Sequence, residues 1–137
     1  MFEFEIVVVS SSLAVRRHVA DILFRLGFDA LSVATLRECR TILGQKAVGL
    51  IFCEAVVSDG NYKDLLAAYP NHKPRVVVMS PSADWQEFSE AMGVGAFDVI
   101  SEPPRARDVE WMLIQARRLE HQVEQPVALT ASAAARR

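Results

Sequence analysis

The sequence predicts an α/β fold in which a parallel sheet of five strands carries helices on both faces. Three observations predict it. Short apolar runs alternate five times with segments of helical periodicity, at intervals of about 20 to 25 residues. Glycine, proline or serine separates these segments, as in βαβ units joined by right-handed crossovers. The chain has 137 residues, 51% of them hydrophobic, which suits one domain with a continuous core.

The strands are predicted from runs rich in Val, Ile and Phe. They are expected at 6–9, 30–33, 48–53, 75–80 and 97–100. Glu54 follows the third run directly, so its carboxylate marks the carboxyl end of a buried strand. In open α/β sheets this edge carries the binding and catalytic groups.

The helices are predicted from apolar residues spaced at i, i+3, i+4 and i+7. They are expected at 13–26, 35–43, 62–69, 82–92 and 107–121. Serines 10–12 can cap the first helix, Gly27 ends it, and Asp21 and Arg25 form an i,i+4 ion pair on it. Trp111 lies off the apolar stripe of the last helix, which consists of Val109, Met112, Leu113 and Ala116.

Composition excludes several classes of function. The net charge of −2 lacks the basic excess of a nucleic-acid-binding domain. Cys39 and Cys53 lie in apolar segments without a CxxC partner, so they are expected as small buried side chains and not as a metal site. No apolar run reaches the ~20 residues of a membrane span, and the acidic N-terminus does not resemble a signal peptide, so a cytoplasmic protein is expected. The domain is expected to cover 1–123, with a low-complexity tail or linker at 124–137.

Four runs together resemble the receiver domains of response regulators (CheY-like). Residues 6–12 resemble the first strand and acidic loop, and 49–60 resemble the strand with the phosphoacceptor aspartate. Residues 75–80 and 95–103 are similar to the fourth and fifth strands, the latter with its Gly-Ala and Pro. The resemblance implies a flavodoxin-like sheet of order 2-1-3-4-5 and a role in two-component signal transduction or a phosphorelay.

The acceptor pocket implied by this resemblance is degenerate. The acidic pair that holds Mg²⁺ falls on Ser10 and Ser11, and the phosphoacceptor falls on Glu54. The hydroxyl that binds the phosphoryl group falls on Ser80 and is retained, whereas the lysine falls on Glu102. Mg²⁺ favours carboxylates over neutral hydroxyls, and a carboxylate at 102 would repel a phosphoryl dianion.

The aromatic switch residue of the family falls on Val99, which has no ring to rotate. We therefore predict a pseudo-receiver that is not an enzyme, uses no metal or cofactor, and acts independently of phosphorylation by binding a signalling or regulatory protein. The alternative is a receiver that still binds metal or accepts phosphate through a rearranged Glu54 site. A nucleotide-binding or enzymatic flavodoxin-like fold is less favoured, because no glycine-rich loop follows a strand.

Two readings of the carboxylates stay open. Glu54 either mimics the phosphorylated state by reaching Ser80, or is a solvated carboxylate at the sheet edge, which we favour slightly. Glu54 and Glu102 either share a cation or a proton, or point apart into water, which we favour.

Partner contacts are expected on the helices near the end of the chain. Trp85 and Trp111 are the candidate interface residues, although ordinary packing is favoured for Trp85 and Phe88. For Trp111, packing and an interface are equally weighted. A homodimer through the last two helices is implied by resemblance only. The arginines at 105, 107, 117 and 118 alternate with acids, as on a solvated helix face, and the histidines at 18, 72 and 121 are scattered.

Overall fold

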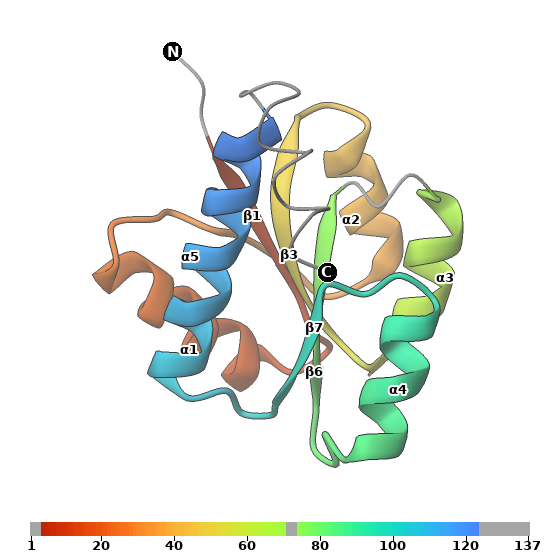
Figure 1. The fold of residues 1–137 in the computed structure, drawn as a ribbon. Helices are drawn as coiled ribbons and strands as arrows, with labels where there is room; N and C mark the ends of the chain where they lie inside the picture. The colour runs from red at the N-terminus through yellow and green to blue at the C-terminus, as the bar shows by residue number, and fades with distance from the viewer. Residues whose placement is uncertain (1–3, 71–73, 124–137) are drawn as a thin grey trace.

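The central feature of the computed structural model, which describes residues 4–70 and 74–123, is a five-stranded parallel sheet (Figure 1). Its strands are β1 (Glu5–Val9), β2 (Leu31–Val33), β3 (Val48–Glu54), β6 (Arg75–Ser80) and β7 (Asp98–Ser101). Their order across the sheet is β2-β1-β3-β6-β7, with parallel pairing throughout. This confirms the predicted order 2-1-3-4-5.

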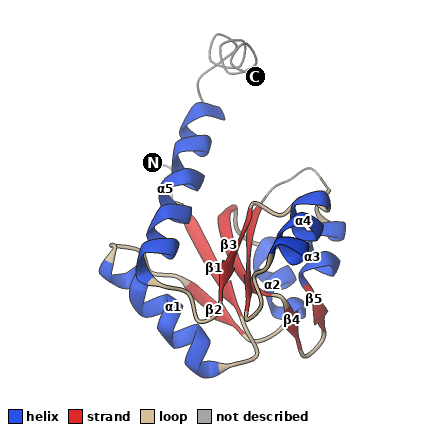
Figure 2. Ribbon diagram, turned by 60° about the horizontal axis from the view of Figure 1, so that its bottom comes forward, coloured by secondary structure: helices blue, strands red, loops and turns tan. Residues whose placement is uncertain are grey.

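Helices cover both faces of the sheet, as predicted (Figure 2). The helices α1 (Leu13–Arg25) and α5 (Ala106–Val123) lie on one face. The other face carries α2 (Leu36–Leu43), α3 (Tyr62–Ala68) and α4 (Trp85–Gly93). The apolar stripe predicted for the last helix is buried as expected.

Alternating strand residues divide the core into two layers. Ile6, Val8 and Phe52 point toward α1 and α5, whereas Val7, Val9 and Cys53 point toward α2, α3 and α4. Because successive side chains of a strand point to opposite faces, a strand covered on both sides must be apolar throughout. This explains the unbroken Val and Ile runs of the sequence.

Local signals in the sequence set several helix ends. The Ser12 side chain caps α1 by accepting from the Val15 N–H at 3.2 Å, and Gly27 follows α1 with a φ of +94°. The Thr35 side chain caps α2, and the predicted ion pair between Asp21 and Arg25 has a separation of 3.0 Å. Cys39 and Cys53 are buried and free, as expected.

The structure corrects the prediction between β3 and α3. This segment, for which the sequence predicts neither strand nor helix, contains a small antiparallel hairpin of β4 (Val56–Val57) and β5 (Gly60–Asn61). Asp59 in its turn accepts hydrogen bonds from the Leu36 and Arg37 N–H groups at 2.9 and 3.1 Å, so it holds the start of α2. Two-residue strands have no periodicity that a sequence pattern can detect.

The packing predicted for the Trp85 side chain is wrong. Helix α4 begins at Trp85, after Asp84 as N-cap, instead of at 82, and it buries only Ala91 against the sheet. Trp85 is 77% exposed, and Phe88 is half-buried and stacks on it with a ring-centroid distance of 5.6 Å. A short helix that approaches the sheet through a small residue leaves its large side chains outside.

Some expectations fall on parts of the chain without a structural description. The predicted tail at 124–137 and His72 lie outside the described residues. No helix of the described ranges has the length and hydrophobicity needed to cross a membrane.

Candidate functional site

The predicted pocket residues meet at the carboxyl edge of the sheet. Ser10 follows β1, Glu54 ends β3 and Ser80 ends β6, and these strands are neighbours in the order β1-β3-β6. Glu102 follows β7, and its N–H donates to the Ser80 carbonyl at 3.0 Å. The parallel register therefore brings together residues that are far apart in the sequence.

The Glu54 carboxylate is anchored to the loop after β1. Its Oε1 accepts from the Ser10 hydroxyl at 3.0 Å and from the Ser11 N–H at 3.1 Å. Hydrogen bonds to an ionised acceptor are among the stronger ones in proteins. The positions where the receiver family has metal-binding acids thus supply hydrogen-bond donors to an anion of the chain itself.

The loop that anchors Glu54 is itself well fixed. Ser10 is fully buried, and its Oγ accepts from the Ser12 N–H at 3.0 Å. The Ser10 carbonyl accepts from Arg16 Nη1 at 2.6 Å, and Ser11 Oγ accepts from the Ser58 N–H at 3.0 Å. The donors to Glu54 are therefore held in place before any ligand arrives.

Glu102 is partly buried at the same edge of the sheet as Glu54, and the charges of the two carboxyl groups act on one another. Burial first, and then a hydrogen bond and the charge of the neighbouring Glu54, raise the pKa of Glu102 from 4.5 to about 7. Glu102 Oε1 is buried and has no hydrogen-bond partner among the described residues. The favoured prediction that both carboxylates point into water fails for Glu102, because its Oε1 is buried.

Ser80 has an acceptor that the sequence prediction missed. Its hydroxyl donates to Glu87 of α4, and its Oγ accepts from the Ser82 N–H at 3.2 Å. The same Glu87 oxygen accepts from the N–H of Ala83, a residue with a φ of +43°. Glu54 is therefore bonded to the β1–α1 loop while Ser80 is bonded to α4, which argues against a mimic in which Glu54 reaches Ser80.

Val99, at the position of the family's aromatic switch, is half-buried and packs against the core layer beneath α4. Its branched side chain fills space there without a ring that could alternate between the core and the surface.

Glu54 and Glu102 are the carboxylates that the pocket offers to a cation. Within residues 4–70 and 74–123, no group of three or more His, Cys, Asp and Glu side chains is placed to hold a metal ion.

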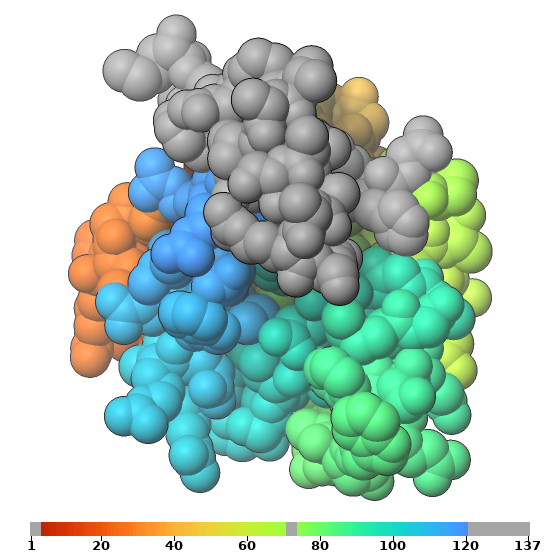
Figure 3. Space-filling view, viewed as in Figure 1, coloured from red at the N-terminus to blue at the C-terminus, as the bar shows by residue number. Residues whose placement is uncertain are grey.

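The candidate interface residues lie on α4 and α5, which flank the edge strand β7 (Figure 1). For Trp111, the sequence weighted ordinary packing and an interface role equally. Its side chain is 54% exposed, so it is not packed into the core. Met92 of α4 and Ile114 of α5 are also exposed. The surfaces of α4 and of the first turns of α5 appear on one face of the space-filling view (Figure 3).

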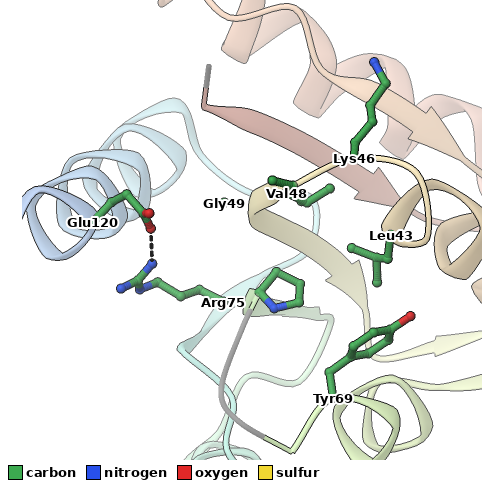
Figure 4. A pocket seen from close by; sticks show the side chains of 9 residues that line it. Leu43, Lys46, Val48, Gly49, Tyr69, Arg75 and Glu120 are labelled. Carbon is green, nitrogen blue, oxygen red and sulfur yellow. Dashed lines mark hydrogen bonds and ion pairs between the residues drawn. The ribbon is translucent and has the colours of Figure 1, made fainter. Parts of the chain in front are cut away.

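A cavity of about 330 Å³ lies at the opposite edge of the sheet, where β3 and β6 begin (Figure 4). Apolar side chains of Leu43, Val48 and Tyr69 line it, together with the ion pair of Arg75 and Glu120 at 3.0 Å. The partners in this ion pair satisfy one another. Lys46 also lines the cavity, and no metal-binding set accompanies these residues in the part of the chain that the structure describes. The cavity therefore does not compete with the carboxyl edge as the candidate site.

No protein-family model matches the chain, and no curated protein sequence matches it. Solved structures, however, match it in fold. The signal receiver domain of an HD domain-containing protein from Pseudomonas fluorescens Pf-5 gives a TM-score of 0.80 at 18% identity, over 93% of this chain and 96% of that one. The chemotaxis response regulator CheY4 of Vibrio cholerae gives 0.74 at 15% identity, over 84% and 99%. The beryllofluoride-activated NtrC4 receiver domain, solved as a dimer, gives 0.74 at 18% identity, over 82% and 94%. The fold predicted by resemblance, that of CheY-like receiver domains, is confirmed.

Proposed function

We propose that this chain, which has a receiver fold, is a pseudo-receiver that signals by binding another protein without being phosphorylated. The observation that carries the proposal is the state of Glu54. Its Oε1 already accepts from Ser10 and Ser11, so the pocket satisfies this carboxylate internally. Phosphoryl transfer needs the opposite arrangement, with a free acceptor and cations that neutralise developing charge.

The remaining pocket residues support the same proposal. Glu102 replaces a cation with a carboxyl group, and Ser80 donates its hydroxyl to Glu87. The Arg16 guanidinium binds the Ser10 carbonyl at 2.6 Å and is thereby already engaged. Each group that would bind a phosphoryl oxygen or its metal is therefore absent or has another partner.

The partner surface we propose lies on α4 and α5, with Trp85 and Trp111 as anchors. Exposed tryptophans contribute strongly to protein interfaces when a partner buries them. Trp85 stacks on Phe88 with a ring-centroid distance of 5.6 Å, and a side chain that already packs on a neighbour loses less entropy on binding. A second copy of the chain, bound through the same helices, is the homodimer form of this proposal.

An NMR titration tests phosphorylation independence. Amide resonances are followed while Mg²⁺ and then beryllofluoride, a phosphoryl mimic, are added. We expect no shifts at Ser11, Glu54 or Ser82. The control is the variant Ser10→Asp/Glu54→Asp/Glu102→Lys, which restores the ligand types of the family and should respond to Mg²⁺. Saturable shifts in the unmodified chain, centred on Glu54, would establish instead the alternative receiver with a rearranged site.

Substitution of the tryptophans tests the surface. Trp85→Ala and Trp111→Ala should each weaken self-association or capture of a regulatory partner by at least tenfold, since interface anchors contribute about 2 kcal/mol or more. Phe24→Ala on α1 is the matched control, because Phe24 is an aromatic residue on another helix whose exposure lies between those of Trp111 and Trp85. Sedimentation analysis gives the mass in solution. Equal effects of all three substitutions would remove α4 and α5 as the specific contact.

A further inference from the structure

We propose that two copies of the chain associate through an antiparallel pairing of their α5 helices, with Ile114 at the two-fold axis. The contact runs along the outer face of α5 and the groove that this helix forms with the end of α1. Such a dimer goes beyond the proposed function, because it needs nothing from the pocket at Glu54 and specifies which residues of two copies meet.

Helix α5 has two sets of apolar side chains, of which its own fold buries only one. The buried set is the stripe predicted from the sequence, and it packs in the core layer that α5 shares with α1. The second set consists of Trp111 and Ile114, which are 54% and 43% exposed. Residues three apart lie on the same side of a helix, so these two side chains are neighbours on the outer face. A helix face that meets only water is normally polar, and this one is therefore a candidate for contact with another chain.

A groove of about 520 Å³ extends this apolar surface toward α1. Both helices lie on the same face of the sheet (Figure 2). Leu26, the half-buried residue directly after α1, and Ile114 give the groove apolar walls. Three exposed charged residues of α5 also line it, Glu110, Arg117 and Arg118. A segment that fits here must therefore combine apolar side chains with charges of both signs.

The charges on this face are complementary to a second copy of themselves. Glu110 lies four residues before Ile114, and Arg118 lies four residues after it. An antiparallel pair centred on Ile114 therefore puts Glu110 of each copy opposite Arg118 of the other, as a two-fold axis requires. A parallel pair would instead oppose like charges. The pattern thus favours a second copy, in antiparallel orientation, as the occupant of the face.

Neither charged residue of this proposed pair is already engaged. The ion pairs formed within residues 4–70 and 74–123 include neither Glu110 nor Arg118. On its own helix, Arg118 follows Ile114 and Gln115 by four and three positions, and neither is a carboxylate. Both side chains are therefore available to a partner.

Arg117 gives the groove a fixed edge. Its guanidinium lies over the rings of Phe28 and Phe4, with distances of 5.3 and 6.0 Å to the ring centroids. Stacking of this kind orders a long side chain before any partner arrives. The same antiparallel pairing puts Trp111, three residues before Ile114, beside Arg117 of the other copy, and an indole ring attracts a guanidinium.

Sedimentation equilibrium of the intact chain tests the dimer. A helix pair buries less than the about 800 Å² per partner of a standard interface, so we expect a dissociation constant of about 100 μM. The chain is measured from about 10 μM to 1 mM, a range that brackets this value. Ile114→Glu places two carboxylates at the axis and should weaken the dimer by at least about tenfold.

Charge reversal tests the register. Glu110→Arg puts two arginines opposite one another and should also weaken association by about tenfold, whereas Glu110→Arg/Arg118→Glu should restore it to within about threefold of the unmodified chain. Arg37→Glu, at an exposed position of α2 on the other face of the sheet, is the matched control and should leave association unchanged. All these positions are exposed, and circular dichroism checks that each variant is folded.

A chain that stays monomeric at every concentration would overturn the proposed dimer, and so would a dimer that Ile114→Glu leaves intact. A double variant that associates as weakly as Glu110→Arg would overturn the antiparallel register. None of these measurements involves beryllofluoride or a second protein. The proposed function can therefore stand if the dimer fails, and the dimer can stand if the pocket binds beryllofluoride.

Discussion

The hydroxyl of Ser10 is the most informative single group to remove. In Ser10→Ala, Glu54 loses one of its two donors to Oε1, and the Ser12 N–H loses an acceptor at 3.0 Å. A hydrogen bond to a charged group contributes about 1.5–3 kcal/mol and a neutral one about 1 kcal/mol. Glu54 is only half-buried and keeps the Ser11 N–H, so water compensates part of the loss. We expect the free energy of unfolding to fall by about 2 kcal/mol.

Urea unfolding at pH 7 measures this change as a decrease of about 1 M in the midpoint, at an unchanged slope. Ser11→Ala is the matched control, because Ser11 is exposed and its hydroxyl accepts only the Ser58 N–H among the described contacts. Its loss should stay below about 1 kcal/mol. Equal losses for the two variants would refute the reasoning that Ser10 anchors Glu54, and an unchanged Ser10→Ala midpoint would refute it more strongly.

Three further predictions concern thiols, packing and acid. Burial raises the pKa of Cys39 to about 11 and also raises that of Cys53, so a thiol reagent at pH 8 should react with neither in the folded protein and with both in denaturant. Gly49→Ala would place a Cβ 2.5 Å from Phe4 Cε1 and should lower the free energy of unfolding by about 1–3 kcal/mol, while Gly93→Ala, with no atom within 4 Å, should not. The N–H groups of Leu36 and Arg37 lower the pKa of Asp59 below 3.8, so its stabilisation is present above pH 3.8 and lost as the pH falls through the lowered pKa. Acid unfolding followed by circular dichroism should therefore have a smaller pH dependence in Asp59→Asn.

The fold was predictable because its signals are local and repeated. A strand such as 75–80 has an unbroken apolar run from Val76 to Met79, and the structure places β6 at Arg75–Ser80. Gly27 and Ser12 mark the ends of α1 through backbone conformation and capping, which depend on few neighbours. The face of α4 was not predictable in this way. Its side chains Trp85, Phe88 and Met92 have the spacing of a buried stripe, and only the tertiary position of Ala91 decides which side meets the sheet.

The sequence predicted which residues line the pocket, but not which hydrogen bonds they form with one another. Strand ends place Ser10, Glu54 and Glu102 at one edge, and a parallel sheet allows no other arrangement. Which hydroxyl bonds which carboxylate depends on side-chain torsions and on Glu87, a residue of another element that the pocket motif does not include. Glu87 follows the cap residue Asp84 by three positions, the place of the acidic residue in a capping box. The side chain turns instead to Ser80 because the loop at Ala83 brings it there.

The residues at the expected pocket positions carry charges that offset one another. This argues that a substitution at one of them affects the others. In the receiver pattern, three carboxylates and one lysine leave an excess of negative charge that Mg²⁺ neutralises. Here the serines remove two carboxylates, and the lysine position holds Glu102, which is neutral when protonated. Below pH 7, where Glu102 is mostly protonated, the carboxylate of Glu54 is met by the donors of Ser10 and Ser11. Restoring one family residue alone breaks this balance. Ser10→Asp would put a second carboxylate at the place of a donor 3.0 Å from Glu54 Oε1, so the free energy of unfolding should fall at neutral pH. Glu102→Lys, in contrast, should be tolerated, because a lysine pairs with the ionised Glu54 and replaces the proton with a fixed positive charge. A lower free energy of unfolding for Ser10→Asp, with little or no loss for Glu102→Lys, in urea unfolding at pH 7 would indicate that charge balance, and not side-chain size, maintains this pocket.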